Sequence, residues 1–226
     1  MSEKLLLLAA FVFSMLLMAE NHRRKRKKIV FFGDSITNYG ARPGGYIAHI
    51  IHLLKEADIE YKYELTGAGA DGNTVIDLIR RIDNDILSKG ADIVIIFIGI
   101  NDVWHQLTGG GTDKETFQNA YAAIIDKLKT VAIEVVLCTP TVIGEKTDFT
   151  NEQDADLEIY SEIVRNLAFK YDLPLIDLRK AFLNYNLIHN TENTDYGILT
   201  YDKVHLNSEG NQLVAKDMWK VLQHVK

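Results

Sequence analysis

Ile93-Val94-Ile95-Ile96-Phe97-Ile98 is the stretch that decides the fold, because all six of its side chains are apolar. A strand covered on both faces reads as such a continuous apolar run, whereas a strand with one face in water alternates between apolar and polar residues. The run stops at Gly99, where small and polar residues take over. We therefore interpret residues 93–98 as a central strand of a parallel sheet, with other structure packed on both of its faces.

Short β-rich runs and longer helical patterns alternate on either side of this strand. The other runs cover residues 29–32, 61–65, 133–137 and 173–176. The helical patterns, with apolar residues three or four positions apart, cover residues 46–57, 74–87, 114–130, 151–171 and 208–222. This alternation is typical of βαβ units. We expect an α/β fold, a flavodoxin-like three-layer α/β/α sandwich with a five-stranded parallel sheet, whose ligands bind beyond the carboxyl ends of the strands.

The composition fits one globular domain over residues 28–226. Of the 226 residues, 47% are hydrophobic and 25% charged, and no repeat or Pro/Gly-rich linker divides this part of the sequence. The formal net charge of -6 argues against nucleic acid as the main partner. Cys138 is the only cysteine, so an internal disulfide is excluded. Because it ends an apolar run, we expect a buried thiol there.

Residues 1–27 stand apart from this domain. Residues 5–18 are almost wholly apolar, but a bilayer span needs roughly 20 such residues. The run fits a secretory signal peptide cleaved near Ala19, which predicts a periplasmic or secreted protein. The basic block at residues 23–28 opposes export, because positive charge after an apolar segment tends to stay in the cytoplasm. An uncleaved membrane anchor and a buried helix of a cytoplasmic protein therefore stay open as alternatives.

Three side chains near predicted strand ends suit nucleophilic catalysis. Ser35 follows the first strand, while Asp202 and His205 lie just before the last helix. A serine hydroxyl becomes a nucleophile when a base removes its proton, and an imidazole is the usual base. Asp202, three residues before His205, could orient that imidazole. Because parallel strands end at one edge of the sheet, these groups can meet there.

A tetrahedral intermediate also needs hydrogen-bond donors for its oxyanion. Gly72 follows the second strand and lies just ahead of the helix that Thr74 opens, so its N–H could point at the oxyanion without a side chain in the way. Asn101 follows the central strand and could add its side-chain amide. The backbone N–H of Ser35 could be the third donor.

In this order, the four blocks resemble the GDSL/SGNH hydrolase family. The blocks are Gly33-Asp34-Ser35-Ile36, Gly69-Ala70-Asp71-Gly72-Asn73-Thr74, Gly99-Ile100-Asn101-Asp102 and Asp202-Lys203-Val204-His205. The resemblance runs from Ile29 to the carboxyl terminus, with Ile36 in place of the family's leucine. It implies an SGNH fold, a nucleophilic Ser35, a His205–Asp202 pair, and an oxyanion hole made by Ser35, Gly72 and Asn101, with Gly69 as the alternative glycine.

The resemblance further implies a serine esterase or acylhydrolase that cleaves a carboxylic ester, of short or acetyl chain, through an acyl-enzyme. We expect such an enzyme to need neither a metal nor an organic cofactor. The expected partner is a small-molecule, glycan or lipid ester, with membrane contact only through an uncleaved amino-terminal segment. We expect Asp34, Trp104 and His105 to bind substrate, and the loop at residues 184–201 to shape the alcohol side of the site. The oligomeric state is not encoded in any pattern we recognise.

Three other functions compete with this one. A nucleotide- or flavin-binding module is disfavoured because the glycine-rich phosphate-binding motifs are missing from the sequence. A metal-dependent hydrolase could use His49 and His52, which lie three residues apart on a predicted helix, but no third ligand stands nearby. A non-catalytic acyl- or glycan-binding member of the same fold is the remaining alternative.

Overall fold

The computed structural model describes residues 26–224 and centres on a five-stranded, all-parallel sheet. The strands are β1 (Lys27–Gly33), β2 (Tyr63–Gly69), β3 (Ile93–Phe97), β4 (Glu134–Cys138) and β5 (Leu175–Ile176). Their order is β2-β1-β3-β4-β5, the doubly wound order of flavodoxin-like folds. The predicted fold class is therefore confirmed. The prediction of a signal peptide or anchor concerns residues that lie outside the described range.

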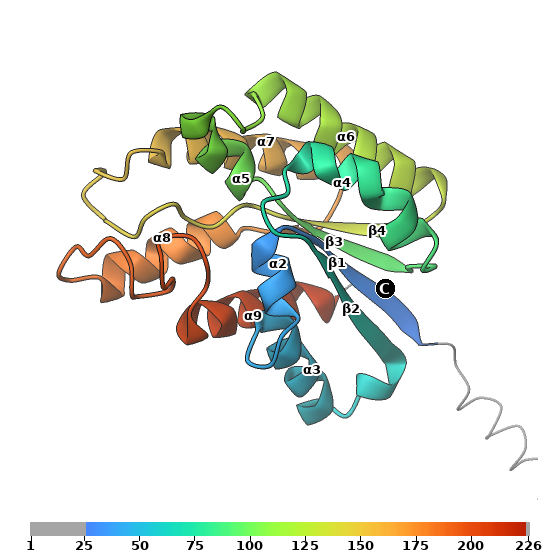
Figure 1. The fold of residues 1–226 in the computed structure, drawn as a ribbon. Coiled ribbons are helices and arrows are strands. Elements are labelled where there is room, and N and C mark those ends of the chain that lie inside the picture. The colour runs from blue at the N-terminus through green and yellow to red at the C-terminus, as the bar shows by residue number, and fades with distance from the viewer. Residues whose placement is uncertain (1–25, 225–226) are drawn as a thin grey trace, which may run out of the picture.

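Helices cover both faces of the sheet (Figure 1). One layer holds α3 (Tyr46–Glu56) and α9 (Ser208–Leu222), and the other holds α4 (Val75–Ile82), α6 (Lys114–Thr130) and α7 (Asp154–Tyr171). Shorter elements are α2 (Ser35–Gly40), η1 (Glu60–Lys62), η2 (Asp83–Leu87), α5 (Ile100–Trp104), η3 (His105–Thr108) and α8 (Leu178–His189). Within residues 26–224, no helix combines the length and apolar character that crossing a bilayer demands.

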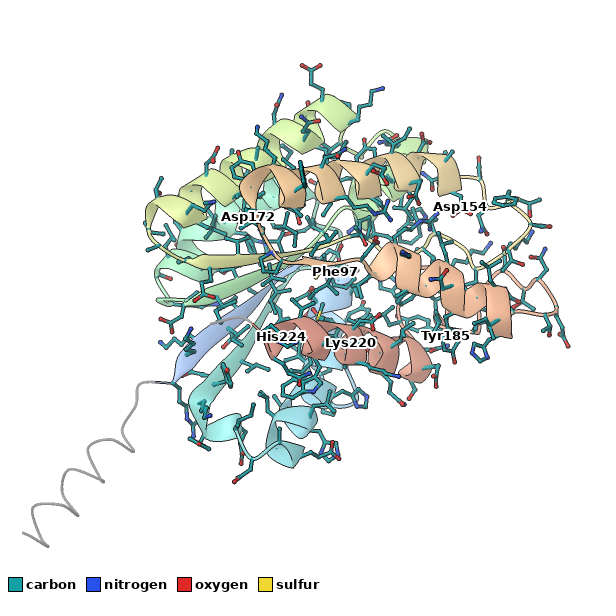
Figure 2. The ribbon with its side chains drawn as sticks, turned by 180° about the vertical axis from the view of Figure 1, so that it is seen from behind. Phe97, Asp154, Asp172, Tyr185, Lys220 and His224 are labelled. Carbon is teal, nitrogen blue, oxygen red and sulfur yellow. The ribbon has the colours of Figure 1, made fainter. Side chains whose placement is uncertain are left out.

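The central strand is buried as its sequence predicts. Every residue of β3 is buried, and Val94, Ile95 and Ile96 are completely shielded from solvent. Figure 2 shows Phe97, at the carboxyl end of β3, between the helical layers of α7 and α9. Cys138 at the end of β4 is buried too, and this burial raises the pKa of its thiol. The cysteine therefore belongs to the apolar core, as expected.

The second strand differs from the sequence prediction. It begins at Tyr63, because residues 60–62 form the short helix η1, and it continues to Gly69. The predicted run ended at residue 65, so it did not include the glycine-rich residues 67–69 that belong to the strand. A Cβ on Gly69 would lie 2.1 Å from the backbone nitrogen of Asn38, so a side chain here would collide with α2. The glycine at position 69 allows α2 to pack closely on the strand. In a sequence pattern, glycine-rich residues instead predict a turn.

The expected long loop at residues 184–201 is partly helical, because α8 extends to His189. The buried face of α8 includes Arg179 and Asn186 beside Leu178 and Phe182, so its apolar pattern is interrupted. At the same time Leu187 is well exposed. A helix with polar residues inside and apolar residues outside escapes prediction from hydrophobic periodicity.

Candidate active site

Three strands end at the same level, and this arrangement brings the sequence blocks together. Gly33 of β1 pairs with Gly69 of β2 and with Phe97 of β3. Just beyond the edge, the N–H of Ala70 donates to the carbonyl of Gly33 over 3.3 Å. The Asn38 amide of α2 donates to the carboxylate of Asp71 over 2.8 Å. The block after β1 is therefore tied directly to the block after β2.

Ser35, His205 and Asp202 form a continuous hydrogen-bonded chain at this edge. Ser35 is the first residue of α2, and its Oγ lies 2.9 Å from Nε2 of His205. The other ring nitrogen, Nδ1, lies 2.6 Å from Oδ2 of Asp202. The residues of the chain come from opposite ends of the domain sequence, and the doubly wound topology makes them neighbours.

The turn from Asp202 to His205 holds the carboxylate against the ring. The backbone N–H groups of His205 and Val204 donate to Oδ1 of Asp202 over 2.7 and 3.1 Å, which leaves Oδ2 for the imidazole. Partial burial opposes ionisation of Asp202, but these donors outweigh it and hold its pKa below the ordinary value. The carboxylate is therefore ionised at neutral pH, as required of a group that fixes a histidine tautomer.

Asn101 is hydrogen-bonded to the residue that follows Gly72. The buried Asn101 donates its Nδ2 to the carbonyl of Asn73 over 2.9 Å, and this bond fixes the side-chain amide. Gly72 has a φ of 74°, and the nearest atom to a Cβ placed on it would be Cε1 of His105, 4.0 Å away. Gly72 therefore borders open space beside His105, while Gly69 is packed against α2, so the geometry favours Gly72 over Gly69.

Two buried carboxyl groups lie behind these donors. Asp34 is only 2% exposed and caps α2 by accepting the N–H of Ile36 over 2.9 Å. Asp102 accepts the N–H of Val75, at the start of α4, over 3.1 and 3.2 Å. Burial raises the pKa of Asp34 to about 7, and the charge of Asp102 adds to the effect. Burial likewise raises the pKa of Asp102 to about 6. Asp34 therefore caps α2, and its expected contact with substrate stays a prediction.

Aromatic rings surround His205. The ring centroids of Tyr39, Tyr201 and Trp104 lie 5.3, 5.7 and 6.3 Å from that of the imidazole. Tyr201 is nearly parallel to the imidazole, at 16°, and its side chain is half exposed. His105 lies against Trp104, with ring centroids 5.9 Å apart. Trp104 and His105 thus lie near His205, and their expected contact with substrate stays a prediction.

Sequence reasoning missed Tyr39 and Tyr201, although both carried a signal. Tyr39 is four residues after Ser35, so the two share one face of α2. Tyr201 directly precedes Asp202. A search for aromatic residues one helical turn or one position from the candidate catalytic residues would have found both.

Of the two histidines suggested as metal ligands, both on α3, His49 is half-buried. His52 is exposed, and its Nε2 lies 3.3 Å from the carboxylate of Glu56, one turn along α3. Across residues 26–224, no group of three or more His, Cys, Asp or Glu side chains is arranged to hold a metal ion.

Comparison with known proteins shows that this α/β sandwich is a carboxylic ester hydrolase. The model of the GDSL-like Lipase/Acylhydrolase family matches residues 31–213, and the chain belongs to this family. The non-catalytic alternative is therefore not retained.

Similar proteins include acetylxylan esterases. One from Geobacillus stearothermophilus is 30% identical over 210 residues, which cover 84% of this chain and 91% of that protein. The crystal structure of the acetyl xylan esterase AlAXEase is 52% identical, with a TM-score of 0.84, and covers 85% of this chain and 98% of that one. Structures of the Geobacillus enzyme include catalytic mutants in which a serine, an aspartate or a histidine is replaced by alanine. One of them has a TM-score of 0.75 at 27% identity and covers 87% of this chain and 94% of that one.

Proposed function

We propose that this protein removes acetyl groups from an acetylated carbohydrate by a serine mechanism in which Ser35 is the nucleophile, His205 the base and Asp202 its orienting partner. The observation that carries the proposal is the unbroken hydrogen-bonded chain from Ser35 Oγ through both ring nitrogens of His205 to Asp202. Catalytic mutants of the Geobacillus acetylxylan esterase affect the same three residue types, which supports the assignment.

The geometry supports a two-step reaction. Ser35 Oγ attacks the acetyl carbonyl carbon while its proton passes to His205 Nε2. The resulting oxyanion accepts hydrogen bonds from the N–H groups of Ser35 and Gly72 and from Nδ2 of Asn101. When the intermediate collapses, His205 returns the proton to the departing sugar oxygen, and acetyl-Ser35 remains. Water then attacks the acetyl carbon by the same route, which releases acetate and restores Ser35.

Two observations support acetylated sugar as the substrate. The relatives named above are acetylxylan esterases. Beside His205, where the alcohol leaves, Tyr39 and the half-exposed Tyr201 offer flat aromatic surfaces with polar hydroxyl ends. Such amphipathic rings suit the apolar face and the hydroxyl rim of a sugar. Export of the protein stays a prediction, because it depends on residues 1–27.

Ester hydrolysis by the wild type and by Ser35→Ala tests the proposal. We expect activity on p-nitrophenyl acetate and acetylated xylo-oligosaccharides to exceed activity on long-chain esters. Ser35→Ala should lose about 10⁴-fold or more in kcat. Ser161→Ala is the matched control, because it also removes a buried serine hydroxyl, one that bonds only to the Leu157 carbonyl of its own helix. It should stay within about two-fold of the wild type. Activity that survives in Ser35→Ala would contradict the nucleophile assignment.

A further inference from the structure

A buried carboxylate lies near the loop that carries Asp202 and His205. Glu145, in the segment after β4, is only 1% exposed. Its Oε2 accepts the N–H of Ile198 over 2.8 Å, and its Oε1 accepts those of Leu199 and Thr200 over 2.7 Å each. Three consecutive backbone N–H groups thus wrap one carboxylate. Among residues 26–224, no lysine or arginine side chain forms an ion pair with it.

The three amides belong to the chain segment that leads into Asp202 and His205. That segment returns on itself as two arms. Thr200 bridges to Leu206 in antiparallel fashion, and the N–H of Tyr201 donates to the carbonyl of His205 over 3.0 Å. The two halves of the segment therefore hold each other in position, and Glu145 binds the first half through residues 198–200.

The backbone beside Glu145 holds the same loop at two further points. The N–H of Gly144 donates to the carbonyl of Lys203, between Asp202 and His205, over 2.9 Å. The N–H of Glu145 donates to the carbonyl of Asp195 over 3.0 Å. Because Val204 is buried as well, the loop has little freedom to move relative to residues 144–145.

We propose that Glu145 is a positioning residue, whose carboxylate holds residues 198–200 so that His205 stays within hydrogen-bond reach of Ser35. It contacts neither of these side chains and acts only through the backbone of the loop. Burying an ionised carboxylate is costly unless donors surround it, and here the loop amides are those donors. The carboxylate therefore accounts for three otherwise unpartnered N–H groups in one loop conformation. The inference rests on the proposed role of His205 as the base.

The Ser35–His205 distance of 2.9 Å leaves little tolerance for movement. A displacement of about 1 Å breaks this hydrogen bond and can cost about 100-fold in rate. Glu145→Gln keeps the size of the side chain but replaces one oxygen by an NH₂ group, which cannot accept an amide hydrogen. The NH₂ group then faces a backbone N–H of the loop. Two hydrogen-bond donors cannot pair, so the loop has to shift.

Steady-state kinetics with p-nitrophenyl acetate test this inference in the full chain. We expect Glu145→Gln to lower kcat by about 10- to 100-fold with KM within about two-fold, because the loop error affects proton transfer. Glu145→Asp keeps the charge and should recover part of the loss. Asp154→Asn is the control, because Asp154 pairs with Arg179 and accepts a hydrogen bond from Asn151, but no hydrogen bond joins it to residues 198–205. It should lower thermal stability and leave kcat unchanged.

A spectroscopic measurement separates positioning from simple destabilisation. In ¹⁵N-histidine-labelled protein, the Nδ1 proton between His205 and Asp202 should give a low-field NMR signal, identified by its loss in His205→Gln. The signal should disappear or broaden in Glu145→Gln, return in Glu145→Asp, and persist in Asp154→Asn. An intact signal in folded Glu145→Gln, or a kcat that falls only with the folded fraction, would overturn the inference. Activity that survives in Ser35→Ala would instead overturn the proposed function, whatever the signal shows.

Discussion

Replacement of Asp34 by asparagine tests how far the fold suppresses ionisation of the carboxyl group beside Ser35, the proposed nucleophile. The carboxyl group is almost completely buried, and its Oδ1 accepts the N–H of Ile36. Asparagine keeps this acceptor and has nearly the same size, but it cannot ionise. Asp34→Asn should therefore leave the cap of α2 in place and remove only the cost of a buried negative charge.

The expected size follows from the pKa of Asp34, which burial raises from 3.8 to about 7. Below pH 4 the group is protonated in the folded and unfolded states alike, so no buried charge lowers the stability of the folded protein. Between pH 4 and 7 the unfolded chain releases the proton while the folded protein keeps it, and stability falls. Each pKa unit corresponds to about 1.4 kcal/mol, so the wild type loses about 4 kcal/mol by pH 8.

Urea unfolding of both proteins from pH 5 to pH 8 measures this loss. The stability advantage of Asp34→Asn should grow by about 2–3 kcal/mol over this range, because part of the titration already lies below pH 5. Asp102 titrates nearby, with its pKa raised to about 6, so the measured gain includes relief of repulsion between the two charges.

Asp113→Asn provides a control with the opposite sign. Asp113 also caps a helix, and its carboxylate accepts the N–H groups of Glu115 and Thr116, but it is exposed. The hydroxyl and backbone of Thr116 are the main cause of its lowered pKa. Its contribution is therefore present at neutral pH and lost as the pH falls, so Asp113→Asn should destabilise at pH 8. If Asp34→Asn behaves in the same way, or if its effect does not change with pH, the burial argument is refuted.

Three further changes address the proposed oxyanion donors and the aromatic rings. Asn101→Ala should lower kcat by about 10²- to 10³-fold with little change in KM, measured by steady-state hydrolysis of p-nitrophenyl acetate; an equal loss in KM would mean that the amide binds the ground state. Gly72→Ala should lose about 1–2 kcal/mol in urea unfolding, because its φ of 74° is strained for alanine, and an unchanged midpoint would contradict this. Tyr201→Ala should raise KM for acetylated xylo-oligosaccharides about five-fold and leave p-nitrophenyl acetate unaffected, and an equal change for both would refute a sugar contact.

The layers of the fold could be predicted because each depends on a local pattern. The apolar run of β3 and the spaced apolar residues of α6 lead directly to a buried strand and an amphipathic helix. The prediction failed where the environment of a residue depends on neighbours that are distant in the sequence. Strand β2 has a glycine at position 69 because α2 approaches it closely. Arg179 of α8 can be buried because Asp154 and Glu158 of α7 pair with it. Neither contact is visible in a window of sequence.

The same distinction separates the parts of the candidate site. Ser35 and the Asp202–His205 pair carry their chemistry in residue type and spacing, so the sequence alone could suggest them. Glu145 is ordinary by residue type, and nothing within ten positions of it hints at a role. Its significance comes from a contact with amides more than fifty residues away. Candidates for reacting groups can therefore be found from sequence. Candidates for positioning groups emerge only when the backbone path is known, because their partners are peptide N–H groups, which every residue except proline possesses.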